Sequence, residues 1–219
     1  MIRIAHTIPR VLLIGLLAVA GCKPYQPPVA NIQHFLRSPQ SVSKLNSVTF
    51  VSLHPQAGTP EIADGITEAL SARIRSKGLF HVDVISNDNA ICEGLPLLSR
   101  QAFTMRELAE IRDALQCDAV LLGSVNHFRS YPRMELGLYV RLLDLKNGNL
   151  VWGVDHNWDT DDLETRRRMA LYCSRETAGG TSPSQYDLCL MSPRAMSEFI
   201  AYEAANTLPD AFAATENKK

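Results

Sequence analysis

The sequence predicts an α/β fold: a single three-layer-type domain with a mixed five-stranded sheet and flanking helices. Strand-like apolar segments alternate with helical periodicity in the first half of the domain, and three strand-like segments then occur in a row. The expected element order is therefore β-α-β-α-β-β-β-α-α, which implies a parallel part and an antiparallel meander. The composition, 46% hydrophobic and 21% charged, is typical of a globular domain.

The first half of the domain begins with a strand, a helix and a second strand. The run Val48–Leu53 is β-branched and apolar, which predicts a strand. Thr59-Pro60 is typical of a helix start, with Thr as N-cap and Pro in the first turn. One apolar face then recurs every fourth position, at Ile62, Ile66, Leu70 and Ile74. Gly78 is a suitable helix stop, and the alternating segment Phe80–Ile85 predicts the second strand.

A second helix leads into the strand-rich half. The segment Thr104–Glu107 is a capping box, in which Thr and Glu satisfy each other's backbone N–H groups. The apolar run in Asp118–Ser124 suits a central strand covered on both faces. Alternation over Met134–Leu142 predicts a half-buried strand. The turn residues Asn147-Gly148, which supply positive φ, connect it to a hairpin partner at Leu150–Val154.

The rest of the domain is predicted to contain two helices and three irregular connections. The helices are Arg166–Leu171 and a last one that starts at Ser192-Pro193 and closes at Leu208-Pro209. The irregular connections are His127–Arg133, the acidic stretch Asp155–Glu164 and the Gly/Ser/Pro-rich loop Glu176–Asp187. The arginines at 166–168 are interpreted as a solvated helix face, with contact to phosphate head groups or an acidic partner as the alternative.

The amino-terminal residues have the features of a cleavable targeting signal. Arg3 and Arg10 precede the uncharged apolar run Val11–Ala20, which is about half the roughly 20 residues that a membrane span needs. The sequence Val19-Ala20-Gly21-Cys22 resembles the bacterial lipobox. This resemblance implies that residues 1–21 are a lipoprotein signal peptide and that Cys22 carries diacylglycerol. Lys23, in place of aspartate, implies the periplasmic face of the outer membrane.

The remaining boundaries follow from composition. Residues 22–45 are predicted to be the lipidated cysteine and a proline-rich tether, because four prolines interrupt any helix and no apolar period is sustained. The periplasmic domain is expected at residues 46–210 and a polar tail at residues 211–219. The formal net charge is −1, and it becomes −3 after loss of the two arginines in residues 1–21, which argues against nucleic acid as a partner.

Four segments together resemble a known family. They are Val48-Thr-Phe-Val, the helix end at Gly78-Leu-Phe, Cys117-Asp-Ala-Val-Leu-Leu-Gly-Ser and Leu142-Leu-Asp-Leu-Lys-Asn-Gly-Asn-Leu-Val-Trp. They are similar to the periplasmic α/β domain shared by curli-secretion lipoproteins, the lipoprotein activator of penicillin-binding proteins, the Pel-polysaccharide export lipoprotein and the TolB amino-terminal domain. The resemblance covers residues 46–158 and implies no catalytic residues. The family's third strand has Ala before Asp, whereas this chain has Asp118-Ala119.

The candidate site residues are few. Cys173 and Cys189 form the preferred disulfide, with buried free thiols as the alternative. A contact with a partner is expected at Arg129, Tyr131 and Arg133, because Tyr and Arg are enriched at interfaces; stabilisation of the turn is the alternative role. No spacing of ligands predicts a metal or a cofactor.

We therefore expect a non-enzymatic, lipid-anchored module that binds a protein partner in a cell-envelope complex. Its role would be regulation of cell-wall synthesis or export. One alternative is a ring-forming export component, and the oligomeric state is left open. Another is a hydrolase with an unrecognised site, which would use Ser124, or Cys92 or Cys117 with His127.

Overall fold

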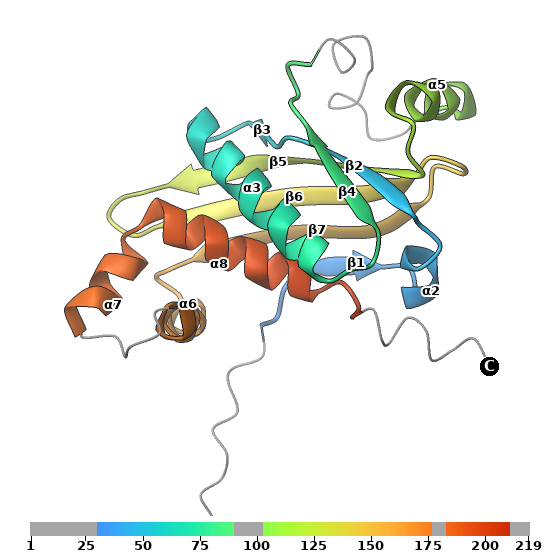
Figure 1. Cartoon of the computed structure of the whole chain (residues 1–219). Coiled ribbons are helices and arrows are strands. Elements are labelled where there is room, and N and C mark those ends of the chain that lie inside the picture. Colours follow the sequence, from blue (N-terminus) through green and yellow to red (C-terminus); the bar gives the residue numbers. More distant parts are fainter. Residues whose placement is uncertain (1–29, 90–102, 177–182, 211–219) are drawn as a thin grey trace, which may run out of the picture.

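The computed structural model describes residues 30–89, 103–176 and 183–210. The strands are β1 His34–Leu36, β2 Ser47–Val51, β3 His54–Pro55, β4 His81–Ile85, β5 Ala119–Arg129, β6 Glu135–Asp144 and β7 Leu150–Asp159. The helices are α2 Pro39–Val42, α3 Pro60–Ser76, α5 Met105–Leu115, α6 Leu163–Glu176, α7 Pro183–Leu190 and α8 Pro193–Asn206. The predicted mixed α/β fold is confirmed (Figure 1).

The sheet has seven strands rather than the five expected. Its order is β1-β7-β6-β5-β2-β4, with the short β3 paired to β5. The strand β2 pairs in parallel with β4 and β5, whereas β5, β6 and β7 form the expected antiparallel meander. The additional strands are β1 and β3, which are too short to show a sequence period.

Local capping signals fix several element boundaries. The Thr104–Glu107 capping box is present at the start of α5, and Ser192 accepts a hydrogen bond from the backbone of Ala195 at the start of α8. Pro60 occupies the first turn of α3, as predicted, although the side chain of Thr59 makes no capping bond. In the β6–β7 turn, only Gly148 of the predicted pair adopts a positive φ, of 68°.

The core lies mainly on one face of the sheet. Figure 1 shows α3 and α8 side by side across this face, and they cover large buried side chains such as Trp152, Trp158 and Phe199. A smaller cluster on the opposite face packs Leu108 and Ile111 of α5 against the sheet. The described chain contains no helix with both the length and the hydrophobicity to span a bilayer.

The predicted tether is wrong for the part of it that the structure describes. From residue 34 the chain forms β1, which pairs antiparallel with β7, and then α2, which Ser38 caps. Ile32, Val42 and Leu45 are buried in the main core. Pro39, interpreted as a helix breaker, occupies the first turn of α2, where proline is tolerated. Isolated apolar residues without a period give no local signal of such packing.

The predicted irregular connections were also too long. The strand β5 continues to Arg129 and β7 continues to Asp159, so both include residues expected to be irregular. The polar side chains at these strand ends alternate with buried ones: Asn157 is exposed whereas Trp158 is fully buried. The predicted loop at 176–187 contains the start of α7 at Pro183, and residues 177–182 of it lie outside the described residues.

Candidate functional site

The predicted contact residues lie at the strand tip, residues 129–135, which joins β5 to β6. Glu135 is the centre of its polar contacts. Its Oε2 accepts from the guanidinium of Arg129 at 2.8 Å and lies 3.0 Å from Nε2 of His127, and its Oε1 accepts from the amide of Asn157. Three neighbouring strand residues therefore hold one carboxylate.

The charge of Glu135 is stabilised by these partners. Burial raises the pKa of Glu135, but the hydrogen bonds from Asn157 and His127 and the charges of His127 and Arg129 outweigh it. The net pKa of Glu135 therefore lies below its ordinary value of 4.5. At neutral pH the carboxylate is ionised and fixes the end of the hairpin.

The other side of the strand tip is held by Asp161, at the start of the connection to α6. Nε of Arg133 donates to this carboxylate at 2.9 Å. The backbone N–H of Met134 donates to the hydroxyl of Thr160 at 3.0 Å, and that hydroxyl lies 3.0 Å from the carbonyl of Met134. The two predicted contact arginines are thus paired within the molecule. Tyr131, in contrast, is 84% exposed.

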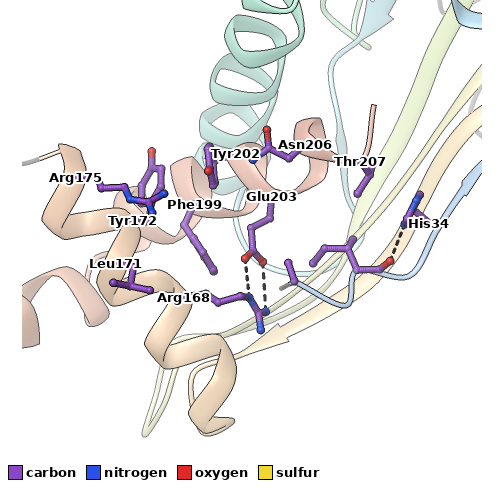
Figure 2. Close-up of a pocket in the computed structure, with 12 residues that line it drawn as sticks. His34, Arg168, Leu171, Tyr172, Arg175, Phe199, Tyr202, Glu203, Asn206 and Thr207 are labelled. Atoms are coloured by element: carbon purple, nitrogen blue, oxygen red, sulfur yellow. Dashed lines mark hydrogen bonds and ion pairs between the residues drawn. The ribbon is translucent and has the colours of Figure 1, made fainter. Parts of the chain in front are cut away.

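A second region is a groove of about 460 Å³ between α6, α8 and the residues before β1 (Figure 2). At its base, Nε of Arg168 donates to Oε1 of Glu203 at 2.7 Å, and the two side chains are only 10% and 4% exposed. The indole N–H of Trp158 donates to the other carboxylate oxygen, also at 2.7 Å. The buried charge of Glu203 is therefore both paired and hydrogen-bonded.

The rim of the groove combines aromatic rings with a cation. Tyr172 and Tyr202 lie 5.3 Å apart between ring centroids, and the guanidinium of Arg73 donates to the Tyr172 hydroxyl at 2.9 Å. Arg175 lines the groove, is exposed and makes no hydrogen bond or ion pair with the described residues. His34 points its Nδ1 at the carbonyl of Ile32, 2.8 Å away.

Sequence reasoning missed this groove and misread one of its residues. The prediction of a solvated arginine face holds for Arg167, which pairs with Glu164 at the surface, and fails for the buried Arg168. A signal was present in α8, because Glu203 continues the apolar face of Met196, Phe199 and Ile200 at helical spacing. An acid at such a position requires a buried partner.

Three of the five cysteines lie in the part of the chain that the structure describes. The structure joins Cys173 of α6 to Cys189 of α7 by a disulfide. Cys117 is a buried free thiol whose pKa is raised, mainly by burial, which makes it a weak nucleophile. Ala119 and His127 are eight positions apart along β5, roughly 26 Å, so Cys117 and His127 do not form a catalytic pair. Cys22 and Cys92 lie outside the described residues.

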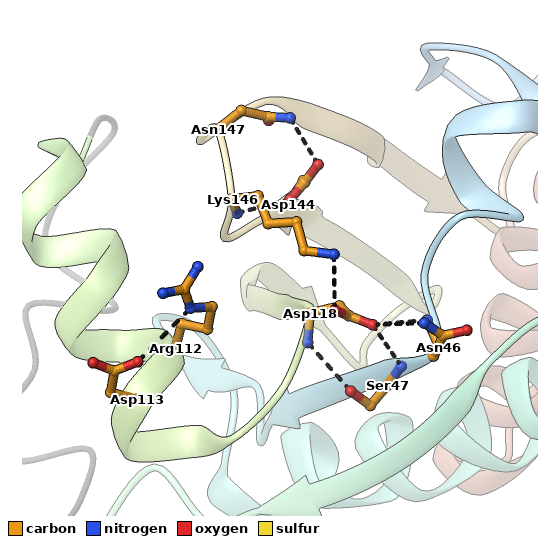
Figure 3. Close-up of polar contacts among 8 residues, drawn as sticks. All are labelled: Asn46, Ser47, Arg112, Asp113, Asp118, Asp144, Lys146 and Asn147. Carbon is orange, nitrogen blue, oxygen red and sulfur yellow. Dashed lines mark hydrogen bonds and ion pairs between the residues drawn. The ribbon is translucent and has the colours of Figure 1, made fainter.

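The aspartate of the family-like motif has a structural role (Figure 3). The Oδ2 of Asp118 accepts from the backbone N–H of Asn46 at 3.0 Å, and its Oδ1 pairs with Nζ of Lys146 at 3.2 Å. The pKa of Asp118 is lowered, chiefly by the Asn46 hydrogen bond. Asp118 thereby joins the start of β2, the start of β5 and the β6–β7 turn, three segments far apart in sequence.

The described residues contain no group of three or more His, Cys, Asp or Glu side chains that would hold a metal ion. Two acids of the connection between β7 and α6 have partners within the protein. Asp161 pairs with Arg133, and Asp162 accepts from the backbone N–H of Thr165 at 2.8 Å at the start of α6. This hydrogen bond is the largest cause that lowers the pKa of Asp162.

No family model and no curated protein matches the sequence. Among solved structures, the PelC dodecamer from Paraburkholderia phytofirmans matches with a TM-score of 0.51 and 15% identity, over 82% of this chain and 97% of that chain. Lipoprotein GNA1162 from Neisseria meningitidis matches with a TM-score of 0.36 and 16% identity, over 51% of this chain and 78% of that chain. LpoB from E. coli matches with a TM-score of 0.36 and 16% identity, over 64% of this chain and 75% of that chain. The likeness to PelC confirms the fold expected from the sequence motifs.

Proposed function

We propose that this protein is a non-enzymatic, lipid-anchored lipoprotein on the periplasmic face of the outer membrane. It acts there as a binding or assembly module of a cell-envelope complex, in the regulation of cell-wall synthesis or in export. The observation that carries the proposal is the fold shared with PelC over nearly the whole of that chain. The lipobox-like sequence at Cys22 supports the anchor, since two or more acyl chains give stable membrane attachment.

The chemistry of the described residues supports binding rather than catalysis. The two carboxylates that would be the first candidates for catalysis have structural roles. The buried Glu203 pairs with Arg168, and Asp118 holds three segments together. The strand tip offers a different kind of surface. Its charged side chains are fixed by Glu135 and Asp161, and the fixed backbone presents the exposed ring of Tyr131. Rigid tyrosines lose little conformational entropy on binding, which suits a partner contact.

The anchor is tested by replacing Cys22 with serine. We expect the Cys22→Ser protein to leave the membrane fraction and to appear in the soluble periplasmic fraction, because it cannot be acylated. Cys92→Ser is the matched control and should remain in the membrane fraction, and density-gradient separation of the wild type should place it with the outer membrane. A Cys22→Ser protein that stays with the membrane would contradict the proposed anchor.

The binding role is tested by capture from crosslinked envelopes. The wild-type chain should recover one assembly in stoichiometric amount, and Tyr131→Ala should lose it. The control is Met105→Ala, which removes another exposed apolar side chain, on α5, far from the strand tip. Recovery that is equal in both variants would count against the strand tip as the contact, and recovery of no assembly would count against the binding role.

The dodecameric state of PelC favours one second candidate, a ring-forming export component. It predicts that the purified, lipidated chain forms a closed assembly. Size-exclusion chromatography and negative-stain microscopy would show rings in that case. A monomer at all concentrations tested would eliminate it.

A further inference from the structure

The structure shortens the connection between the proposed anchor and the folded domain. The inference that follows rests on the proposed lipidation of Cys22. Seven residues, 23–29, separate Cys22 from Ala30, which already lines the groove. Fully extended, this connection spans roughly 26–29 Å, whereas a tether that ends at residue 45 would span roughly 80 Å or more. A flexible chain of this length has a mean end-to-end distance of roughly 14–17 Å.

This length restricts which surface can approach the bilayer. A compact domain of this size has a diameter of about 40 Å, which exceeds the reach of the connection. The domain therefore cannot turn its surface near Ala30 to the side farthest from the bilayer, and at the mean length of the connection Ala30 lies within roughly 14–17 Å of the lipid. We name this surface the amino-terminal face and define it as the groove residues contributed by α6, by the end of α8 and by the residues before β1.

The amino-terminal face has the chemistry of a membrane–water interface. Among the described residues that line the groove, Glu203 is the only acid, and Arg168 neutralises it, which leaves the exposed Arg175 as a net positive charge. The partly exposed ring of Tyr202 lies on the same face, packed against the buried ring of Tyr172 (Figure 2). Tyrosine rings sit favourably at the level of lipid headgroups, and an arginine near the surface is attracted to anionic lipid.

We propose that the amino-terminal face lies against the phospholipid headgroups of the membrane that holds Cys22, with the guanidinium of Arg175 on lipid phosphate. The strand tip lies away from the residues before β1 in the fold and stays accessible to a periplasmic partner (Figure 1). The domain thus rests on the bilayer in one orientation, and the strand tip faces a periplasmic partner from a fixed position relative to the membrane.

The test uses the full, lipidated chain in vesicles of phosphatidylethanolamine with a minority of phosphatidylglycerol. A benzophenone amino acid replaces either Asn206, an exposed residue of the groove, or Met105, an exposed residue of α5. After illumination of the pelleted vesicles, mass spectrometry measures lipid adducts of the protein. We expect a lipid adduct at position 206 and none at position 105.

The contribution of Arg175 is measured in the same assay. Arg175→Gln should lower the adduct at position 206 roughly fivefold, the equivalent of one basic residue near an anionic surface. Arg106→Gln, which removes an exposed arginine of α5, should leave it unchanged. An unchanged adduct in Arg175→Gln would exclude the phosphate contact of this residue.

Failure of the orientation is distinguishable from failure of the anchor. Protein that pellets with the vesicles and gives no adduct at position 206, or equal adducts at both positions, overturns the orientation and leaves the anchor intact. Protein that carries no lipid and remains in the supernatant contradicts the anchor, and the orientation is then wrong as well.

Discussion

Two arginine–carboxylate pairs, one in the groove and one at the strand tip, show how burial changes the role of the same chemistry. Nε of Arg168 lies 2.7 Å from Oε1 of Glu203, and Nε of Arg133 lies 2.9 Å from Oδ1 of Asp161. The first pair is 10% and 4% exposed, and the second is 46% and 57% exposed. Removal of one buried partner leaves an uncompensated charge in the core, whereas water solvates the other partner at the surface. We therefore assign the groove pair to the stability of the core and the strand-tip pair to the local conformation of the strand tip.

The largest expected effect is at the groove pair. Arg168→Leu should lower the free energy of unfolding by about 3–5 kcal/mol, because Glu203 then remains buried without its cation. Urea denaturation followed by circular dichroism measures this loss. The double variant Arg168→Leu with Glu203→Leu should lose less than the single variant. If Arg168→Leu lost no more free energy of unfolding than Arg133→Ala at the strand tip, burial would not explain a difference between the two pairs.

The disulfide next to the groove is expected to contribute slightly less. It closes a loop with a sequence separation of 16, and a loop of that size corresponds to about 3 kcal/mol of chain entropy in the unfolded state. Cys173→Ser should lower the free energy of unfolding, measured by urea denaturation, by about this amount. A reducing agent should lower the free energy of unfolding of the wild type to the same value. Wild-type protein that titrates with two extra free thiols after denaturation would show that this disulfide does not form.

The strand tip should respond to acid. The pKa of Glu135 is lower in the folded protein than its ordinary value of 4.5, so the carboxylate stabilises the fold above that value. This contribution is lost as the pH falls below 4.5 and through the folded pKa of Glu135. Urea midpoints measured from neutral to acidic pH should therefore fall less steeply for Glu135→Gln than for the wild type. Identical slopes would mean that the hydrogen bonds at Glu135 do not favour its charged form.

The smallest effect on stability is expected for the exposed pair. Arg133→Ala should change the free energy of unfolding by less than about 1 kcal/mol, since an exposed ion pair contributes little. Urea denaturation alongside Arg168→Leu provides a direct comparison. A loss as large as that of the groove variant would assign the strand tip to the folding core instead.

Much of the fold could be predicted because its signals are local. The helix starts at Pro60, Met105 and Pro193 follow from Pro or capping residues, and the alternation in β6 specifies its buried face. The candidate site could be predicted less well. The sequence predicted a partner contact at Arg129, Tyr131 and Arg133. It did not show that Arg129 pairs with Glu135 across the strand tip, or that Arg133 pairs with Asp161 of the distant connection to α6.

The sequence by itself determined the order of the five longer strands and of α3, α5, α6 and α8, the capping box of α5 and the mixed character of the sheet, because these depend on residues a few positions apart. Only the tertiary structure decided that residues 30–45 belong to the domain, that Arg168 is buried and that a groove forms beside Ala30. Each of these depends on a contact between segments far apart in the chain, such as β1 with β7 or α6 with α8. Such contacts leave no period in the sequence. They also create the burial that determines how much stability is lost when one partner of an ion pair is removed.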